Sequence, residues 1–211
     1  LKYFNLPGRA EVIRVLLSHL KLNWENCLIE KSDWLSLKPS IYGGQLPVLE
    51  VYKKGEQTPA TVLNESSAIA AVIAMKYNLY ALDSPCRHMK LRKTEGICTD
   101  VDLPRFMWHR ADAEGKPMQE KICAQILPAR LQKLVNALKE NTEGNMKYFA
   151  GGSITLADII AFVTIQRALR FNPDILKNEA PELIAFHDSL LADSEGIRDY
   201  ISNWPKYTVL I

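Results

Sequence analysis

Strand signals in this 211-residue chain are confined to about its first eighty residues. There, short aromatic and β-branched runs bounded by Pro and Gly alternate with helical periodicity. From residue 85 onward, only apolar residues at helical spacing recur. A chain of this length forms one large domain or two small ones. We therefore predict a small α/β domain over residues 1–79, a linker at 80–85 and an all-helical domain over residues 86–211.

The element order expected in the first domain is β-α-β-α-β-β-α. The strands are expected at 2–5, 25–30, 47–52 and 61–63, and the helices at about 10–21, 32–35 and 66–77. The helices of the second domain are expected at about 85–111, 117–141, 155–170, 181–192 and 194–202.

Charge and cysteine usage exclude several classes of protein. Twenty-six Lys and Arg stand against 24 Asp and Glu, which is too balanced to indicate nucleic-acid or membrane-surface binding. No apolar run is long enough for a transmembrane helix, and no secretory signal or metal-ligand motif is visible. The cysteines form no C-x-x-C pair, so we expect free thiols in a reducing, cytoplasmic setting; they are Cys27, Cys86, Cys98 and Cys123.

Tyr3 ends the first predicted strand, and Pro7-Gly8-Arg9 opens the helix that follows. A tyrosine in this position directs its hydroxyl toward a helix N-terminus, which favours anions. The ordinary alternative is a core tyrosine with a solvated tip.

Three further features of the first domain each have a structural and a functional interpretation. A cis Leu46–Pro47 bond after Gln45 offers backbone partners to an extended peptide, although Leu-Pro also simply marks a strand boundary. Ser66, after Glu65, caps a helix, and its backbone N–H can hold a carboxylate. Trp34 and Lys38 lie one helical turn apart and can face the same way, or they are a half-buried indole beside a solvated lysine.

The segment Ser153–Ile159 of the second domain carries a capping box. Thr155 is the expected N-cap, Asp158 reaches back to it, and Ile154 and Ile159 occupy the hydrophobic staple positions. We interpret this motif as structural.

These motifs, taken together in this order, resemble the cytosolic glutathione transferases. The likeness is to the sigma-like, tyrosine-type enzymes, which include glutathione-dependent prostaglandin D synthases, and it covers essentially the whole chain. The motifs that carry it are Tyr3-Phe4-Asn5-x-x-Gly8-Arg9-Ala10-Glu11, Asp33-Trp34-x-x-x-Lys38, Gly44-Gln45-Leu46-Pro47-Val48-Leu49-Glu50-Val51, Glu65-Ser66-x-Ala68-Ile69-Ala70 and Ser153-x-Thr155-x-Ala157-Asp158.

The resemblance implies a thioredoxin-like first domain, a homodimer and glutathione as co-substrate. Tyr3 would donate its hydroxyl to the glutathione sulfur, and Arg9 would lie near the thiolate or the second substrate. The remaining implied contacts with glutathione are Trp34 and Lys38 at the glycyl carboxylate, Gln45, Leu46 and cis-Pro47 at the cysteinyl unit, Glu65 and Ser66 at the γ-glutamyl group, and Asp102 from the partner subunit.

The resemblance also implies a pocket for a second, hydrophobic substrate. Its expected lining is Leu6, Pro7, the segment Arg105-Phe106-Met107-Trp108-His109 and the C-terminal Val209-Leu210-Ile211. The activity this favours is conjugation of glutathione to hydrophobic electrophiles, as in detoxification. Two alternatives stay open at this point: a glutathione-dependent isomerase of the prostaglandin D synthase type, and a non-catalytic carrier of hydrophobic ligands such as haem or a structural protein.

Overall fold

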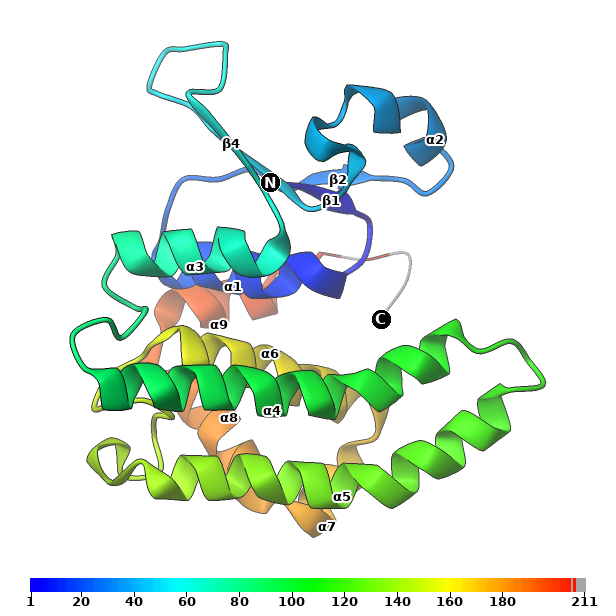
Figure 1. The fold of residues 1–211 in the computed structure, drawn as a ribbon, viewed down its shortest axis with the longest axis vertical. Coiled ribbons are helices and arrows are strands. Elements are labelled where there is room, and N and C mark those ends of the chain that lie inside the picture. The colour runs from blue at the N-terminus through cyan, green and yellow to red at the C-terminus, as the bar shows by residue number, and fades with distance from the viewer. Residues whose placement is uncertain (206, 208–211) are drawn as a thin grey trace.

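The computed structural model describes residues 1–205 and 207. The molecule has two parts that differ in secondary structure (Figure 1). A four-stranded sheet with its helices forms one end of the molecule, and helices alone form the rest. This arrangement confirms the predicted fold class, an α/β part followed by an all-helical part.

The sheet has the strand order β2-β1-β3-β4. Strand β1 pairs in parallel with β2 and antiparallel with β3, and β4 is antiparallel to β3. Tyr3 therefore lies in an inner strand, opposite Leu28. The strands are β1 (Lys2–Phe4), β2 (Cys27–Ile29), β3 (Val48–Val51) and β4 (Thr61–Asn64).

The helices follow the predicted order, with one addition. Helix α7 (Pro173–Glu179) was not predicted, because its seven residues are too few to show a periodic apolar stripe. Its N-cap Asn172 accepts a hydrogen bond from the backbone N–H of Ile175. The other helices are α1 (Glu11–His19), α2 (Trp34–Leu37), α3 (Ser66–Lys76), α4 (Pro85–Arg110), α5 (Lys116–Glu140), α6 (Leu156–Phe171), α8 (Pro181–Asp193) and α9 (Glu195–Ser202).

Helix α6 is the centre of the molecule, since it packs against α1, α4 and α8. The predicted capping box at its start is confirmed: the Asp158 carboxylate accepts hydrogen bonds from the backbone N–H and the hydroxyl of Thr155, both at 2.7 Å. It also accepts one from the backbone N–H of Phe149. Burial raises the pKa of Asp158 to about 6, against an ordinary value of 3.8.

Helix α4 passes through Pro104. A proline has no N–H to offer the carbonyl four residues earlier. That carbonyl, of Asp100, instead accepts a hydrogen bond from the Arg130 side chain on α5. Helix α4 thus continues to Arg110, and it packs against α6.

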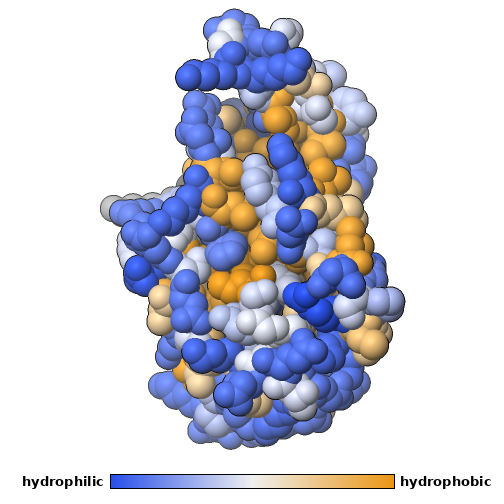
Figure 2. Space-filling view, turned by 90° about the vertical axis from the view of Figure 1, so that its left-hand side faces the viewer, coloured by the Kyte–Doolittle hydropathy of each residue, from blue (hydrophilic) through white to orange (hydrophobic). Residues whose placement is uncertain are grey.

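The surface is unevenly polar. Seen from one side, hydrophilic residues cover the two ends of the molecule, and apolar residues form an interrupted band between them (Figure 2). Among the described residues, we find no helix with the length and apolarity needed to cross a membrane.

Candidate active site

The Tyr3 hydroxyl lies at the N-terminal end of the helical segment that leads into α1. The backbone N–H of Arg9 donates to the Tyr3 oxygen at 3.0 Å, which is the placement expected from the sequence. Among the described residues, the hydroxyl accepts this bond and donates none in return. A phenol has one proton to donate, so the Tyr3 proton is left for a ligand.

Gly8 makes this approach possible. Its φ of +42° lies in the left-handed region, and a Cβ at this position would come within 2.6 Å of the Tyr3 oxygen. Any side chain here would push the hydroxyl out of place.

Arg14 supports the same loop from beneath. It is fully buried, and its guanidinium donates to the carbonyls of Leu6 and Pro7 at 3.1 and 3.0 Å. Its centre lies 5.6 Å from the centroid of the Tyr3 ring. The loop between β1 and α1 is therefore fixed, and a buried cation lies beside the phenol.

The other predicted glutathione contacts come from α2 and from the segments that precede β3 and α3. Trp34 is half-buried, with its ring edge-on to Phe4 at a centroid distance of 5.3 Å, and Lys38 is exposed one turn later. Gln45 is exposed, and the Leu46–Pro47 bond is cis, as the resemblance implied. The Arg9 side chain is exposed, so in this structure its backbone rather than its guanidinium meets Tyr3.

The start of α3 differs in detail from the sequence prediction. Ser66 is the first helical residue rather than the cap, and Glu65 takes the N-cap position with a φ of +64°. This φ turns the chain sharply out of β4, and α3 begins at Ser66, where the sequence predicted the helix to start. The backbone N–H of Ser66 still belongs to the first turn, where N–H groups have no partner within the helix.

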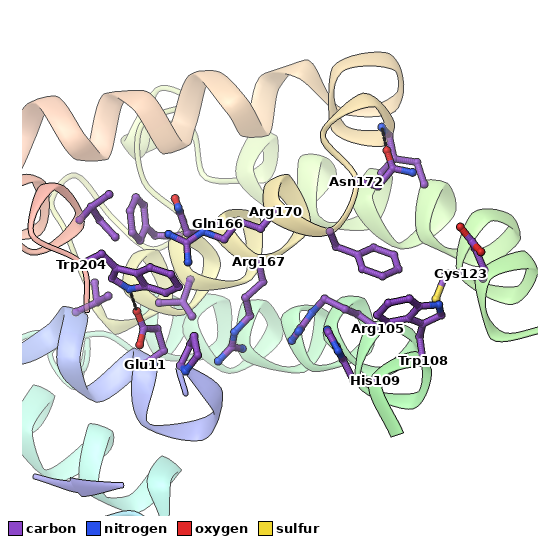
Figure 3. Close-up of a pocket in the computed structure, with 18 of the residues that line it drawn as sticks. Glu11, Arg105, Trp108, His109, Cys123, Gln166, Arg167, Arg170, Asn172 and Trp204 are labelled. Atoms are coloured by element: carbon purple, nitrogen blue, oxygen red, sulfur yellow. Dashed lines mark hydrogen bonds between the residues drawn. The ribbon is translucent and has the colours of Figure 1, made fainter. Parts of the chain in front are cut away.

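A cavity of about 430 Å³ lies between the two parts of the molecule. The N-terminal part contributes Pro7, Glu11 and Val15, and the rest of the lining comes from α4, α5, α6, the segment after it and the C-terminal region (Figure 3). Its size is within the usual range for small-molecule sites, about 300–1,000 Å³.

Four of the residues predicted for the second-substrate pocket line this cavity: Pro7, Arg105, Trp108 and His109. Phe106 and Met107 are not part of the lining, because α4 turns them away from it. Leu6 packs in the buried core instead. The predicted lining residues Val209, Leu210 and Ile211 lie outside the described residues.

The sequence analysis missed the contribution of α6. Gln166, Arg167 and Arg170 line the cavity one after another along this helix. They continue the face that begins with the buried Val163, at helical spacings of three and four residues. Polar residues that extend an otherwise apolar helix face were the signal that could have identified them.

Glu11 is a second cavity residue that the sequence analysis did not assign. It is 5% exposed and accepts hydrogen bonds from Arg14, from the hydroxyl of Tyr200 and, at 2.6 Å, from the indole N–H of Trp204. Its charge is therefore fully compensated within the fold.

Asp102 lies on α4, and its carboxylate forms ion pairs with two arginines of the same subunit. Its carboxylate accepts from Arg167 at 2.6 Å and from Arg105 at 3.4 Å. Arg167 also donates to the carbonyl of Gly8, so it ties α4 and α6 to the loop beneath Tyr3. Whether Asp102 also serves a partner's site stays a prediction.

No cysteine stands out as a nucleophile in the described residues. All four are free thiols, with Cys27 and Cys86 exposed and Cys98 and Cys123 buried. Cys123 lines the cavity, but burial raises its pKa, which disfavours the reactive thiolate.

Two family models match the chain in sequence. The N-terminal domain of glutathione S-transferase matches residues 1–74, and its C-terminal domain matches residues 100–203. A class-mu 28 kDa glutathione S-transferase from Schistosoma japonicum is 33% identical over 205 residues, covering 95% of both chains. This chain belongs to the glutathione S-transferase family.

Other members of the family extend this likeness. A hematopoietic prostaglandin D synthase from Gallus gallus is 30% identical over 211 residues, covering 99% of this chain and 98% of that protein. The solved structure of a sigma-class transferase from Fasciola hepatica matches with a TM-score of 0.87 and 26% identity, covering 96% of this chain and 94% of that one. Like these proteins, this glutathione transferase is an enzyme with glutathione as its co-substrate.

Proposed function

We propose that this enzyme activates glutathione through the Tyr3 hydroxyl and transfers the thiolate to hydrophobic electrophiles bound in the cavity. The observation that carries the proposal is the hydrogen bond from the Arg9 N–H to the Tyr3 oxygen. It fixes the hydroxyl and leaves its proton free for the glutathione sulfur. The buried Arg14, which is ion-paired with Glu11, holds the loop that carries this N–H through the carbonyls of Leu6 and Pro7.

One hydrogen bond from Tyr3 can supply the free energy needed to ionise the glutathione thiol. A thiol with a pKa of about 8.5 is only about 3% ionised at pH 7. Lowering that pKa by about two units needs about 2.7 kcal/mol of preference for the thiolate. One hydrogen bond to a charged group supplies about 1.5–3 kcal/mol. Tyr3 at a helix N-terminus therefore accounts for the activation without a protein nucleophile.

The rest of glutathione would lie along the sheet. Trp34 and Lys38 would hold the glycyl carboxylate, and the Leu46 backbone beside Gln45 and Pro47 would pair with the cysteinyl unit. The first-turn N–H of Ser66 would bind the γ-glutamyl carboxylate, with Glu65 at its amino group. Arg9, exposed beside the Tyr3 loop, would lie near the thiolate.

The proposed assembly is a cytoplasmic homodimer with a role in detoxification. In it, Asp102 would reach the partner's glutathione. Asp102→Ala should then weaken glutathione binding in an intact dimer, whereas Arg105→Met, which removes one of its partners within the subunit, should not. Equal losses from the two variants, measured by calorimetric titration, would show that Asp102 acts only through its own subunit.

A second candidate activity is a glutathione-dependent isomerisation of the prostaglandin D synthase type. It is favoured by the 30% identity to the synthase of Gallus gallus over essentially the whole chain. Tyr3 would serve the same purpose in both reactions. A carrier role for hydrophobic ligands is compatible with either, because none of the proposed glutathione contacts lines the cavity.

Conjugation of a chromogenic chlorinated nitrobenzene tests the proposed mechanism. We expect kcat/KM to fall about 10–100-fold in Tyr3→Phe while glutathione affinity is retained, since one charge-assisted hydrogen bond is lost. Tyr52→Phe is the matched control, because Tyr52 is exposed and distant from this loop along the chain. Wild-type turnover no faster than that of Tyr3→Phe would refute the role of Tyr3.

A further inference from the structure

His187 on α8 is a buried histidine that lies behind the cavity wall. It is 6% exposed and is not part of the cavity lining. Its ring stacks on that of Phe162, which does line the cavity, with the ring centroids 4.6 Å apart and 3° between the ring planes. A residue in this position can act on a bound substrate only through the side chains that lie between them.

The hydrogen bonds of His187 fix the tautomer of its ring and the direction of the Gln166 amide. The Asp188 carboxylate can only accept, so Nδ1 carries the ring proton and donates it to Asp188 at 3.0 Å. The neutral ring then has a lone pair on Nε2, and the Gln166 amide donates an N–H to it. The Gln166 oxygen therefore points the other way, where it accepts from Nε and Nη2 of Arg170 at 3.3 and 3.2 Å.

Arg170 in turn contacts Trp204. The centre of its guanidinium lies 3.3 Å from the centroid of the indole ring, and Gln166, Arg170 and Trp204 all line the cavity (Figure 3). At its edge, the Trp204 N–H donates to Glu11 at 2.6 Å. The indole is therefore held at its face and at its edge, and the contact at its face depends on the Gln166 amide that His187 orients.

We propose that His187 is a positioning residue for the second substrate, which acts through Gln166 and Arg170 to fix the cavity wall at Trp204. The inference rests on the proposed function, in which the cavity holds the electrophile. None of the proposed glutathione contacts belongs to this series of side chains. His187 should therefore affect the affinity for the electrophile and leave the affinity for glutathione unchanged.

Protonation of His187 would reverse the arrangement. With a proton on Nε2 the ring donates, so the Gln166 amide has to turn its oxygen toward His187 and its NH₂ toward Arg170, where two donors then meet. Burial lowers the pKa of His187 below the ordinary 6.5; of the charges beside it, Asp188 raises this pKa and Arg170 lowers it. The affinity of the cavity should therefore fall as pH falls through this lowered pKa.

Charged side chains on α5, α7 and α9, the other helices packed against α8, have partners of their own. They are Lys139 on α5, paired with Glu182; Lys177 on α7, paired with Asp174; and Arg198 on α9, which donates to the carbonyls of Leu191 and Ala192. In the part of the chain that the structure describes, Asp188 and Arg170 are thus the charges that act on the ring.

The test measures binding of m-dinitrobenzene, which resembles the chlorinated nitrobenzene but has no leaving group and does not react. Equilibrium dialysis at about pH 7 with saturating glutathione gives its Kd. His187→Phe keeps the stacked ring and removes both nitrogens, and we expect it to raise this Kd about 3–10-fold, as loss of one hydrogen bond would give. His88→Phe is the matched control, because His88 also lies against an aromatic ring, that of Tyr80, and outside the cavity lining. An unchanged Kd in His187→Phe, or equal changes in both variants, would overturn the proposal.

A double-mutant cycle tests the route through Arg170. Arg170→Met should raise the Kd by itself, and adding His187→Phe to it should change the Kd by less than about 1.5-fold further, because the two side chains act in series. Additive effects would contradict the proposed route. The KM for glutathione, measured on the same samples, should stay within about 2-fold of wild type.

His187→Gln is the conservative variant, and it carries the test if His187→Phe does not fold. Its amide oxygen can accept from Gln166 in place of Nε2, but it takes up no proton, so we expect wild-type affinity at about pH 7. Between about pH 7 and about pH 5, the wild-type Kd should rise at least about 3-fold more than that of the variant. His109 lines the cavity and titrates in both proteins, so the difference between them reports on His187. Equal pH dependence would overturn the proposal.

Failure of this inference can be distinguished from failure of the proposed function. If wild type binds m-dinitrobenzene and conjugates the chlorinated compound, but the His187 variants behave as wild type does, this inference fails and the proposed function stands. If wild type does neither, the proposed function is wrong and this inference falls with it.

Discussion

At the scale of single residues, the site depends on a close contact between a glycine and a tyrosine. The hydroxyl of Tyr3 is held by the Arg9 N–H at 3.0 Å, and Gly8 provides the space for it. Tyr3 and Gly8 were both identifiable from sequence, because Pro-Gly after an aromatic strand marks the turn. Arg14 was not, since nothing in an amphipathic helix shows that an arginine on its apolar side will be fully buried against carbonyl groups.

Substitution of Gly8 tests this contact. Gly8→Ala should reduce kcat/KM at least about 10-fold, because the new Cβ would lie 2.6 Å from the Tyr3 oxygen and displace it. Gly55→Ala is the matched control: Gly55 also has a positive φ, of +85°, but a Cβ there meets nothing within 4 Å. A steady-state comparison in which both variants lose the same activity would assign the effect to backbone strain alone.

At the scale of elements, the capping box at the start of α6 was predicted in full from the sequence. The Thr155–Asp158 spacing was sufficient, because both partners of a capping box are local in the chain. The cavity face of α6 was not predicted, since it forms only when α4 and α1 pack against that helix. The short helix α7 was missed because its seven residues are too few to show a repeating apolar stripe.

The buried Asp158 predicts a pH dependence of stability. Its folded pKa of about 6 exceeds its ordinary 3.8, so between these values the folded state binds more protons than the unfolded state. Stability from this group is therefore greatest at low pH and declines as pH rises through that window, by about 2–3 kcal/mol.

Asp158→Asn removes this titration. Its unfolding free energy at any one pH should be lower than that of wild type, because an amide has one acceptor oxygen for the three hydrogen bonds that Asp158 accepts. The deficit should shrink as pH rises from about 4 to about 7. Urea denaturation across this range measures it, and a deficit that stays constant or grows would contradict the raised pKa.

At the scale of the whole molecule, the function depends on the junction between the two parts. The cavity is lined from both, and Arg167 joins Asp102 on α4 to the Gly8 carbonyl beneath Tyr3. The sequence indicated two regions, and the resemblance assigned site residues to both, but it could not show how their surfaces meet. Contacts between residues 159 positions apart in the chain, such as Arg167 with Gly8, leave no local signal.

The proposed dimer leads to a prediction about α4. Leu103 and Met107 lie one turn apart on this helix, beside Asp102, and each is 47% exposed. Leu103→Glu should weaken the dimer at least about 10-fold by placing a charge in an apolar contact. Leu35→Glu, at a site 82% exposed on α2, is the control. Light scattering over a concentration series reports the mass, and a dimer equally stable in all three proteins would exclude this face as the interface.

The central claim is that Tyr3 lowers the pKa of bound glutathione, and the most direct measurement is a titration of that thiol. The thiolate absorbance of the glutathione complex is followed against pH for wild type and Tyr3→Phe. We predict a thiol pKa about two units below the free value of about 8.5 in wild type, and within about half a unit of it in Tyr3→Phe. Equal pKa values in the two complexes would contradict the account.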